Sequence, residues 1–280
     1  MKTKKTGSFL KAAGIALTIA TISGIPASPF TSSAFAAPAV MTIDDNHDAK
    51  AIKIIEASLE ALGGREALEA IKFMHQTGTI SIPAMGVDGT IETNIASPDK
   101  LRILIDLPMM GKTTQGFNDG VAWSFDAMNG PRILPDEEAS DIINQTNLMY
   151  PLEFLKNNPT IEYVEETEFD GQAAHKIHTI NTDGKESYNY YAVESGHQIG
   201  SEAETESPMG KINIVTMLRE YKEIGGQIQP TKMVQKIGPT EVLISIEIAD
   251  SGKIEDSVFE MPAAVTALIE ATAAKEKAAP

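Results

Sequence analysis

The sequence contains no cysteine among its 280 residues. This absence excludes disulfide bonds, thiolate nucleophiles and metal sites built from sulfur ligands. A domain without such cross-links depends on its hydrophobic core, and a chain of this length is long enough to bury one.

Basic residues are scarce relative to acidic ones. The chain has 23 lysines and arginines against 39 aspartates and glutamates, which gives a formal net charge of -16. A chain this acidic repels phosphate backbones, and it lacks the basic stripe that nucleic-acid binding needs. We therefore expect no nucleic-acid partner and interpret most of the charge as a solvated surface.

Signatures of catalysis and of cofactor binding are also missing. The sequence has no Gly-x-Ser-x-Gly elbow, phosphate loop, dinucleotide fingerprint or His-Glu-x-x-His motif. His175 and His178 are three residues apart, which places them on opposite faces of a strand and disfavours a shared metal ion. The sequence therefore predicts a protein that is not an enzyme and has no cofactor or metal.

No apolar run reaches the roughly 20 residues that a membrane-spanning helix needs. Instead, the amino-terminal segment carries four lysines, a shorter apolar stretch over residues 12–25 and an Ala-x-Ala site at 34–36. Gly24, Pro26 and Pro29 interrupt or follow the stretch. This order is typical of a cleavable secretory signal peptide. We predict a signal peptide over 1–36 and a mature chain over 37–280.

Export has two further consequences for the mature chain. The leader holds four lysines and no acidic residue, so its removal lowers the net charge from -16 to -20. No cysteine follows the apolar stretch, so the chain has no acceptor for an amino-terminal lipid. We expect a periplasmic protein that is released into solution, with secretion as the alternative.

Apolar residues at helical spacing predict a helix over 48–62, where Gly63 and Gly64 follow its end. Beyond it the period changes to two, and turn sequences bound each alternating run. About ten or eleven short strands favour an antiparallel meander, open or closed. Two further helices are predicted over 135–148 and 262–275. The fold class is α+β, mainly β, with one domain over 37–280.

The alternating runs predict an inward face that is aliphatic and uncharged. A sheet of this width can leave room inside for a ligand, and an aliphatic lining suits a lipid. A solid core with helices packed on it is the alternative, and the pattern leaves both open. The candidate ligand-binding residues are Leu101, Ile103, Ile105, Phe117, Trp123, Phe125, Ile212, Ile214, Val242, Ile244 and Ile246.

Methionines recur at three Pro- and Gly-containing turns. Strand order places the first two turns at one end of the sheet, and the third joins them if the excursion over 135–158 leaves and returns at that end. Flexible thioether side chains there would form an adaptable rim around the cavity, although each could simply cap the core. The candidate rim residues are Met85, Met109, Met110 and Met209. The helical excursion after residue 135 is a candidate lid, with Ile142, Leu148 and Phe154 on it.

Six short segments occur in a familiar order. They are ALGGREAL at 61–68, SPDKLR at 97–102, GFNDGVAW at 116–123, YY at 190–191, EYKEIGG at 220–226 and FEMP at 259–262. In this order the chain resembles the bacterial outer-membrane lipoprotein-sorting family, over most of the mature chain. The Pro-Asp-Lys and Asp-Gly-x-x-Trp turns are the more specific of these motifs.

The resemblance implies an incomplete antiparallel barrel of about ten to eleven strands, covered by a few helices. It also implies a hydrophobic cavity for lipid or lipoprotein acyl chains, a carrier without catalysis, and membrane-bound donor and acceptor proteins as partners. The missing lipidation cysteine matches the soluble, monomeric carrier type. The chain is longer than the typical carrier, and the family's arginine contact between barrel and helix has no counterpart that we can place.

Three hypotheses follow for the function. The first is a periplasmic carrier or binding protein for a lipid or a lipidated partner. The second is a non-catalytic accessory or interaction module of the envelope with a filled core. The third, ranked last, is a small enzyme in the cavity, for which only Tyr188, Tyr190, His175 and Glu92 offer polar groups.

Overall fold

The computed structural model describes residues 46–108, 110–207, 210–224 and 227–278. The predicted signal peptide over 1–36 and the predicted rim residues Met109 and Met209 lie outside the described residues.

The strands are β1 (Asn46–His47), β2 (Phe73–Ile82), β3 (Val87–Ala96), β4 (Lys100–Leu107), β5 (Gly111–Asn118), β6 (Val121–Asp126), β7 (Gly130–Ile133), β8 (Thr160–Phe169), β9 (Gln172–Ile180), β10 (Glu186–Ala192), β11 (Gln198–Ser207), β12 (Gly210–Ile224), β13 (Gln227–Ile237) and β14 (Thr240–Asp250). The helices are α1 (Ala49–Ala61), α2 (Gly64–Ala70), α3 (Asp136–Asn144), α4 (Tyr150–Asn157) and α5 (Ala263–Ala278), with the short 3-10 turns η1 (Pro83–Met85) and η2 (Asp256–Phe259).

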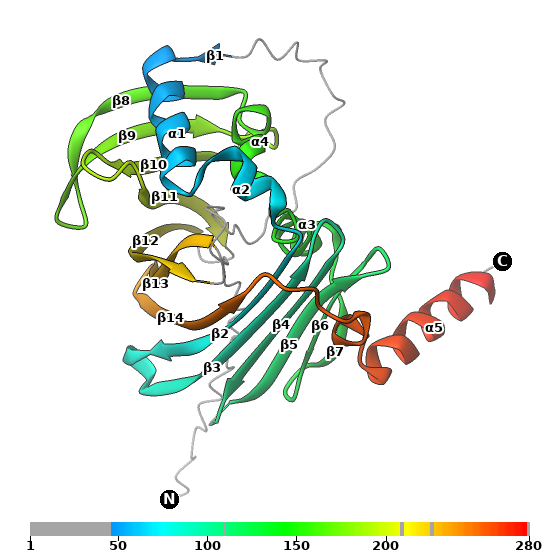
Figure 1. The fold of residues 1–280 in the computed structure, drawn as a ribbon. Coiled ribbons are helices and arrows are strands. Elements are labelled where there is room, and N and C mark those ends of the chain that lie inside the picture. Colours follow the sequence, from blue (N-terminus) through cyan, green and yellow to red (C-terminus); the bar gives the residue numbers. More distant parts are fainter. Residues whose placement is uncertain (1–45, 109, 208–209, 225–226, 279–280) are drawn as a thin grey trace, which may run out of the picture.

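All of these strands belong to one 14-stranded sheet, in the order β1-β8-β9-β10-β11-β12-β13-β14-β2-β3-β4-β5-β6-β7. Neighbouring strands are antiparallel except β1 and β8, which are parallel. Because β1 and β7 lie at opposite edges, the sheet is an incomplete barrel, as predicted (Figure 1). The predicted number of strands was too low, in part because the two-residue β1 and the four-residue β7 are too short to show alternation.

Helix α1 begins where the sequence predicts it. The Asp48 carboxylate accepts hydrogen bonds from the backbone N–H groups of Lys50 and Ala51, which caps the amino terminus of the helix. The chain leaves the helix through Gly63, whose φ of 105° favours glycine. Helix α1 then lies across the β8–β10 part of the sheet (Figure 1).

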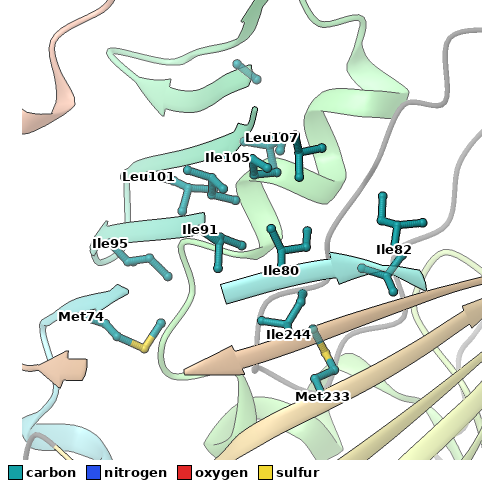
Figure 2. Packing of buried hydrophobic residues seen from close by; sticks show 14 of the residues in the cluster. Met74, Ile80, Ile82, Ile91, Ile95, Leu101, Ile105, Leu107, Met233 and Ile244 are labelled. Atoms are coloured by element: carbon teal, nitrogen blue, oxygen red, sulfur yellow. The ribbon is translucent and has the colours of Figure 1, made fainter. Parts of the chain in front are cut away.

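We define the inner face as the face of the sheet that packs against α1, α3 and α4. One cluster on it holds Ala51 and Ile55 of α1, Phe154 of α4, and Ile161 and Ile177 of the sheet. A larger cluster joins β2–β6 to β12–β14 and to α3. In Figure 2 its isoleucine, leucine and methionine side chains lie together between the strands.

Parts of the opposite, outer face of β2–β7 are covered by η2 and α5. Phe259 of η2 is buried with Ala96 and Ile254, and the Asn118 side-chain amide donates to the Phe259 carbonyl oxygen at 3.2 Å. Helix α5 follows η2 and packs against β6 and β7 (Figure 1). Part of the outer face of this half of the sheet, near η2 and α5, is therefore covered as well.

Candidate functional site

Nine of the predicted ligand-binding residues share the inner face. The cross-strand register places Leu101 beside Phe117, Gly78 between Ile246 and Ile91, and Ile214 beside Ile237. The nine residues are Leu101, Ile103, Ile105, Phe117, Ile212, Ile214, Val242, Ile244 and Ile246. Most of them are buried in the larger cluster, where they contact one another and α3.

Trp123 and Phe125 were predicted on this face, and that placement is wrong. Phe117 pairs with both Leu101 and Ala122, so Ala122 faces inward and its neighbour Trp123 faces outward. On the outer face the indole covers Gly116, where an added Cβ would lie 2.6 Å from the ring. Alternation could not determine the orientation of β6, because η2 and α5 cover the face that Trp123 occupies.

The described rim residues lie on hairpins at one end of the sheet. Met85 lies in the β2–β3 connection and Met110 in the β4–β5 connection, and antiparallel order brings these two hairpins to the same end. The side chains are 48% and 42% exposed. Their role as a rim stays a prediction.

The predicted lid residues pack onto the inner face. Ile142 of α3 and Leu148 belong to the larger cluster, and Phe154 of α4 joins the cluster under α1. All three are buried. Leu148 and Phe154 also line a pocket between the helices and the sheet.

This pocket has a volume of about 110 Å³. Its walls come from α1 and α2, from α4 and the residue Leu148 before it, and from β2 and β10–β13. Most of the lining is aliphatic or aromatic, with Ile55, Leu59, Leu68 and Leu218 among the residues. Among the described residues, no charged side chain lines it; the polar lining groups are Ser58, Tyr150, Tyr191, Gln198, Tyr221 and Gln229.

Burial keeps the tyrosines of the pocket neutral. It raises the pKa of the Tyr150, Tyr191 and Tyr221 phenols above the ordinary value. The Tyr221 hydroxyl donates to the Gln198 carbonyl oxygen at 2.6 Å. The pocket therefore offers hydrogen-bonding groups without charge.

Gln229 is a polar lining residue with a buried donor that is unused among the described residues. Its side chain is buried, and its Oε1 accepts a hydrogen bond of 2.5 Å from Nε2 of the buried Gln76. The Gln229 Nε2 has no hydrogen-bond partner within the part of the chain that the structure describes. An orphaned buried donor of this kind costs about 1–3 kcal/mol.

A second polar feature crosses the inner face as a row of paired residues. Asn189, Ser201, Thr216 and Gln235 lie side by side on β10, β11, β12 and β13, and all four are buried. Asn189 is satisfied by Thr179, Ser187 and Gln198, whereas neither amide atom of Gln235 has a hydrogen-bond partner in the described ranges. The predicted aliphatic lining is thus incomplete, because polar residues at alternate positions normally indicate an outward face.

We expect Gln235→Leu to stabilise the protein. The substitution removes two orphaned polar atoms from a side chain that is 1% exposed, which should raise the free energy of unfolding by about 1–3 kcal/mol. Gln76→Leu is the matched control. Gln76 is as deeply buried as Gln235, but its replacement breaks the hydrogen bond to Gln229 and should therefore destabilise the protein. Urea unfolding measures both, and a loss of stability in Gln235→Leu would contradict this account.

The candidate catalytic residues do not converge. Tyr190 lies on the outer face, where its hydroxyl donates to Glu202 at 2.9 Å, and Tyr188 shares that face. Glu92 alternates with the inward-facing Ile91 and Thr93, so it also faces outward. His175 alone shares the inner face, beside Tyr191.

Within the described ranges, no helix is both long and apolar enough to cross a membrane. The described histidine and acidic side chains form no group of three that could hold a metal ion.

Comparison with solved structures defines the class of fold. A DUF1329 family protein from Desulfovibrio piger superposes with a TM-score of 0.52 at 11% identity, over 76% of this chain and 98% of the other. A LolA superfamily protein from Nitrosomonas europaea gives 0.51 at 11% identity, over 75% and 97%. The chain therefore has a LolA-like fold, as the resemblance of the sequence implied. No family model and no curated protein matches the sequence.

Proposed function

We propose that the protein is a periplasmic carrier or binding protein that holds a lipid, or the acyl chains of a lipoprotein, between the inner face and its helices. The observation that carries this proposal is the uncharged pocket where α1, α2 and α4 meet the inner face of a LolA-like sheet. Each methylene group buried there would contribute about 0.8 kcal/mol.

The size of the pocket sets a condition on binding. A volume of about 110 Å³ is well below the roughly 300 Å³ at which small-molecule sites begin. A whole acyl chain therefore needs α1 and α4 to move away from the sheet. These helices contact the sheet mainly through apolar side chains, and an acyl chain can make apolar contacts that replace those lost when the helices move.

The direct test is denaturing extraction of the purified protein followed by lipid mass spectrometry. We expect a co-purified lipid, together with saturable uptake of a fluorescent neutral lipid by the emptied protein. Because the proposed carrier binds reversibly, delipidation should leave the protein folded. Absence of both co-purified lipid and uptake would remove the carrier proposal.

The second candidate is an accessory module with a filled core. It is favoured by one observation: Leu101, Ile103 and Ile105 pack against other side chains of their cluster and do not line the pocket. This hypothesis expects no lipid and one stable protein partner. Cross-linking in cells should then capture that partner at close to equal amounts.

A further inference from the structure

We propose that the pocket selects lipids with an uncharged carbonyl group, an ester or an amide, and that Gln229 Nε2 donates the hydrogen bond that recognises it. This inference rests on the proposed function and names the ligand chemistry that the same site accepts. It depends on the polarity of the pocket rather than on its volume.

The first argument is the unused donor. Gln229 lines the pocket and is 6% exposed; its Nε2, which neighbouring atoms cover in this closed structure, has no hydrogen-bond partner among the described residues. The bond from Gln76 occupies Oε1 of the same amide and holds that end of the group. A carbonyl oxygen accepts from an N–H donor, so a lipid ester or amide supplies what Gln229 lacks.

The second argument is the missing charge. A carboxylate or phosphate buried in this pocket would meet no lysine, arginine or protonated histidine of the described chain, because none of these residues is in its described lining. Burying an unpaired anion is far more unfavourable than burying a hydrogen-bonded neutral group. The pocket therefore favours an esterified acyl chain over the corresponding free fatty acid.

The third argument is that most of the lining is hydrocarbon. Leu59, Leu218 and Ile228 are among the apolar lining residues, and the polar lining residues, Gln229 included, are uncharged. A ligand that suits this lining is mainly hydrocarbon and carries few polar groups, none of them charged. An acyl chain joined through an ester or amide has this composition.

Two lipids that differ only at the carbonyl test the inference. In 1-palmitoylglycerol the 16-carbon chain is joined by an ester, whereas 1-O-hexadecylglycerol has the same chain and head group joined by an ether. Binding of each to the full-length mature protein is measured by displacement of a neutral fluorescent probe. We expect the ester to bind about tenfold more tightly, as one buried hydrogen bond predicts, and palmitate to bind more weakly than the ester.

The variants assign the preference to one residue. Gln229→Leu should bind ester and ether equally, whereas Ile228→Leu, a volume-conserving change in the same lining, should keep the preference. Since Gln229→Leu leaves Gln76 without its acceptor, Gln76→Leu/Gln229→Leu provides a second variant in which both polar groups are gone.

The outcomes separate the two proposals. Equal binding of ester and ether by the unmodified protein would overturn the inference and leave the carrier standing; this comparison needs no variant to fold. A preference that persists in both glutamine variants would also overturn the assignment. If neither lipid nor any extracted lipid binds, the proposed function itself fails.

Discussion

A disulfide that ties α1 to the sheet should block lipid uptake, and its reduction should restore it. The Cβ of Ala61, at the end of α1, lies 3.7 Å from the position of a Cβ added at Gly196, in the β10–β11 turn. This separation falls within the range of disulfides. If only the opened state admits an acyl chain, closing it covalently lowers the apparent affinity by about 100-fold or more.

Because the sequence has no cysteine, no other thiol competes with the engineered pair. The Ala61→Cys/Gly196→Cys pair can form only one intramolecular bridge, and thiol titration measures how completely it forms. Gly196 has a φ of 74°, so a side chain there is strained. The reduced double variant carries the same strain and is therefore the control. Equal uptake by the oxidised and reduced forms would show that α1 does not have to move.

Trp123→Ala should cause a large loss of stability without changing lipid preference. The indole is fully buried on the outer face, and truncation of such a side chain costs about 3–5 kcal/mol. Because Trp123 faces away from the pocket, the variant that remains folded should keep the selectivity between ester and ether. Chemical unfolding measures the loss of stability, and probe displacement at low temperature measures the selectivity between ester and ether.

Ile133→Ala is the control for this substitution. Ile133 pairs with Trp123 from β7 and shares its face, but its side chain is 37% exposed. The Ile133→Ala substitution should lower the free energy of unfolding by no more than about 1 kcal/mol. A change of lipid selectivity in Trp123→Ala, with Ile133→Ala unchanged, would place Trp123 in the ligand site after all.

The periodicity of the sequence predicted most of the inner face. Strands β4 and β14 alternate cleanly, so Leu101 to Ile105 and Val242 to Ile246 have the predicted orientation. The alternation ends at a bulge between Ile246 and Ile248, after which Ile248 is 60% exposed. Strand β6 was misassigned because both of its faces are buried, so alternation carries no information about orientation.

The polar groups of the pocket could not be read from the sequence in the same way. Gln229 and Gln235 alternate with Lys232 and Val234 on β13, and glutamine in a strand normally indicates solvent. The burial of Gln229 depends on what covers the strand: α1, α2 and α4, with which it lines the pocket, come from segments more than 70 residues away in the chain. Only the assembled layers show which polar groups lose their water.

The sequence by itself determined the class of fold, the start of α1, the low content of basic residues and the lack of cysteine, since each depends on local patterns or on composition. The tertiary structure decided which face Trp123 occupies, where the pocket lies and which amide groups are left without partners. Those properties arise from contacts between distant segments, and a periodicity of two residues cannot specify them.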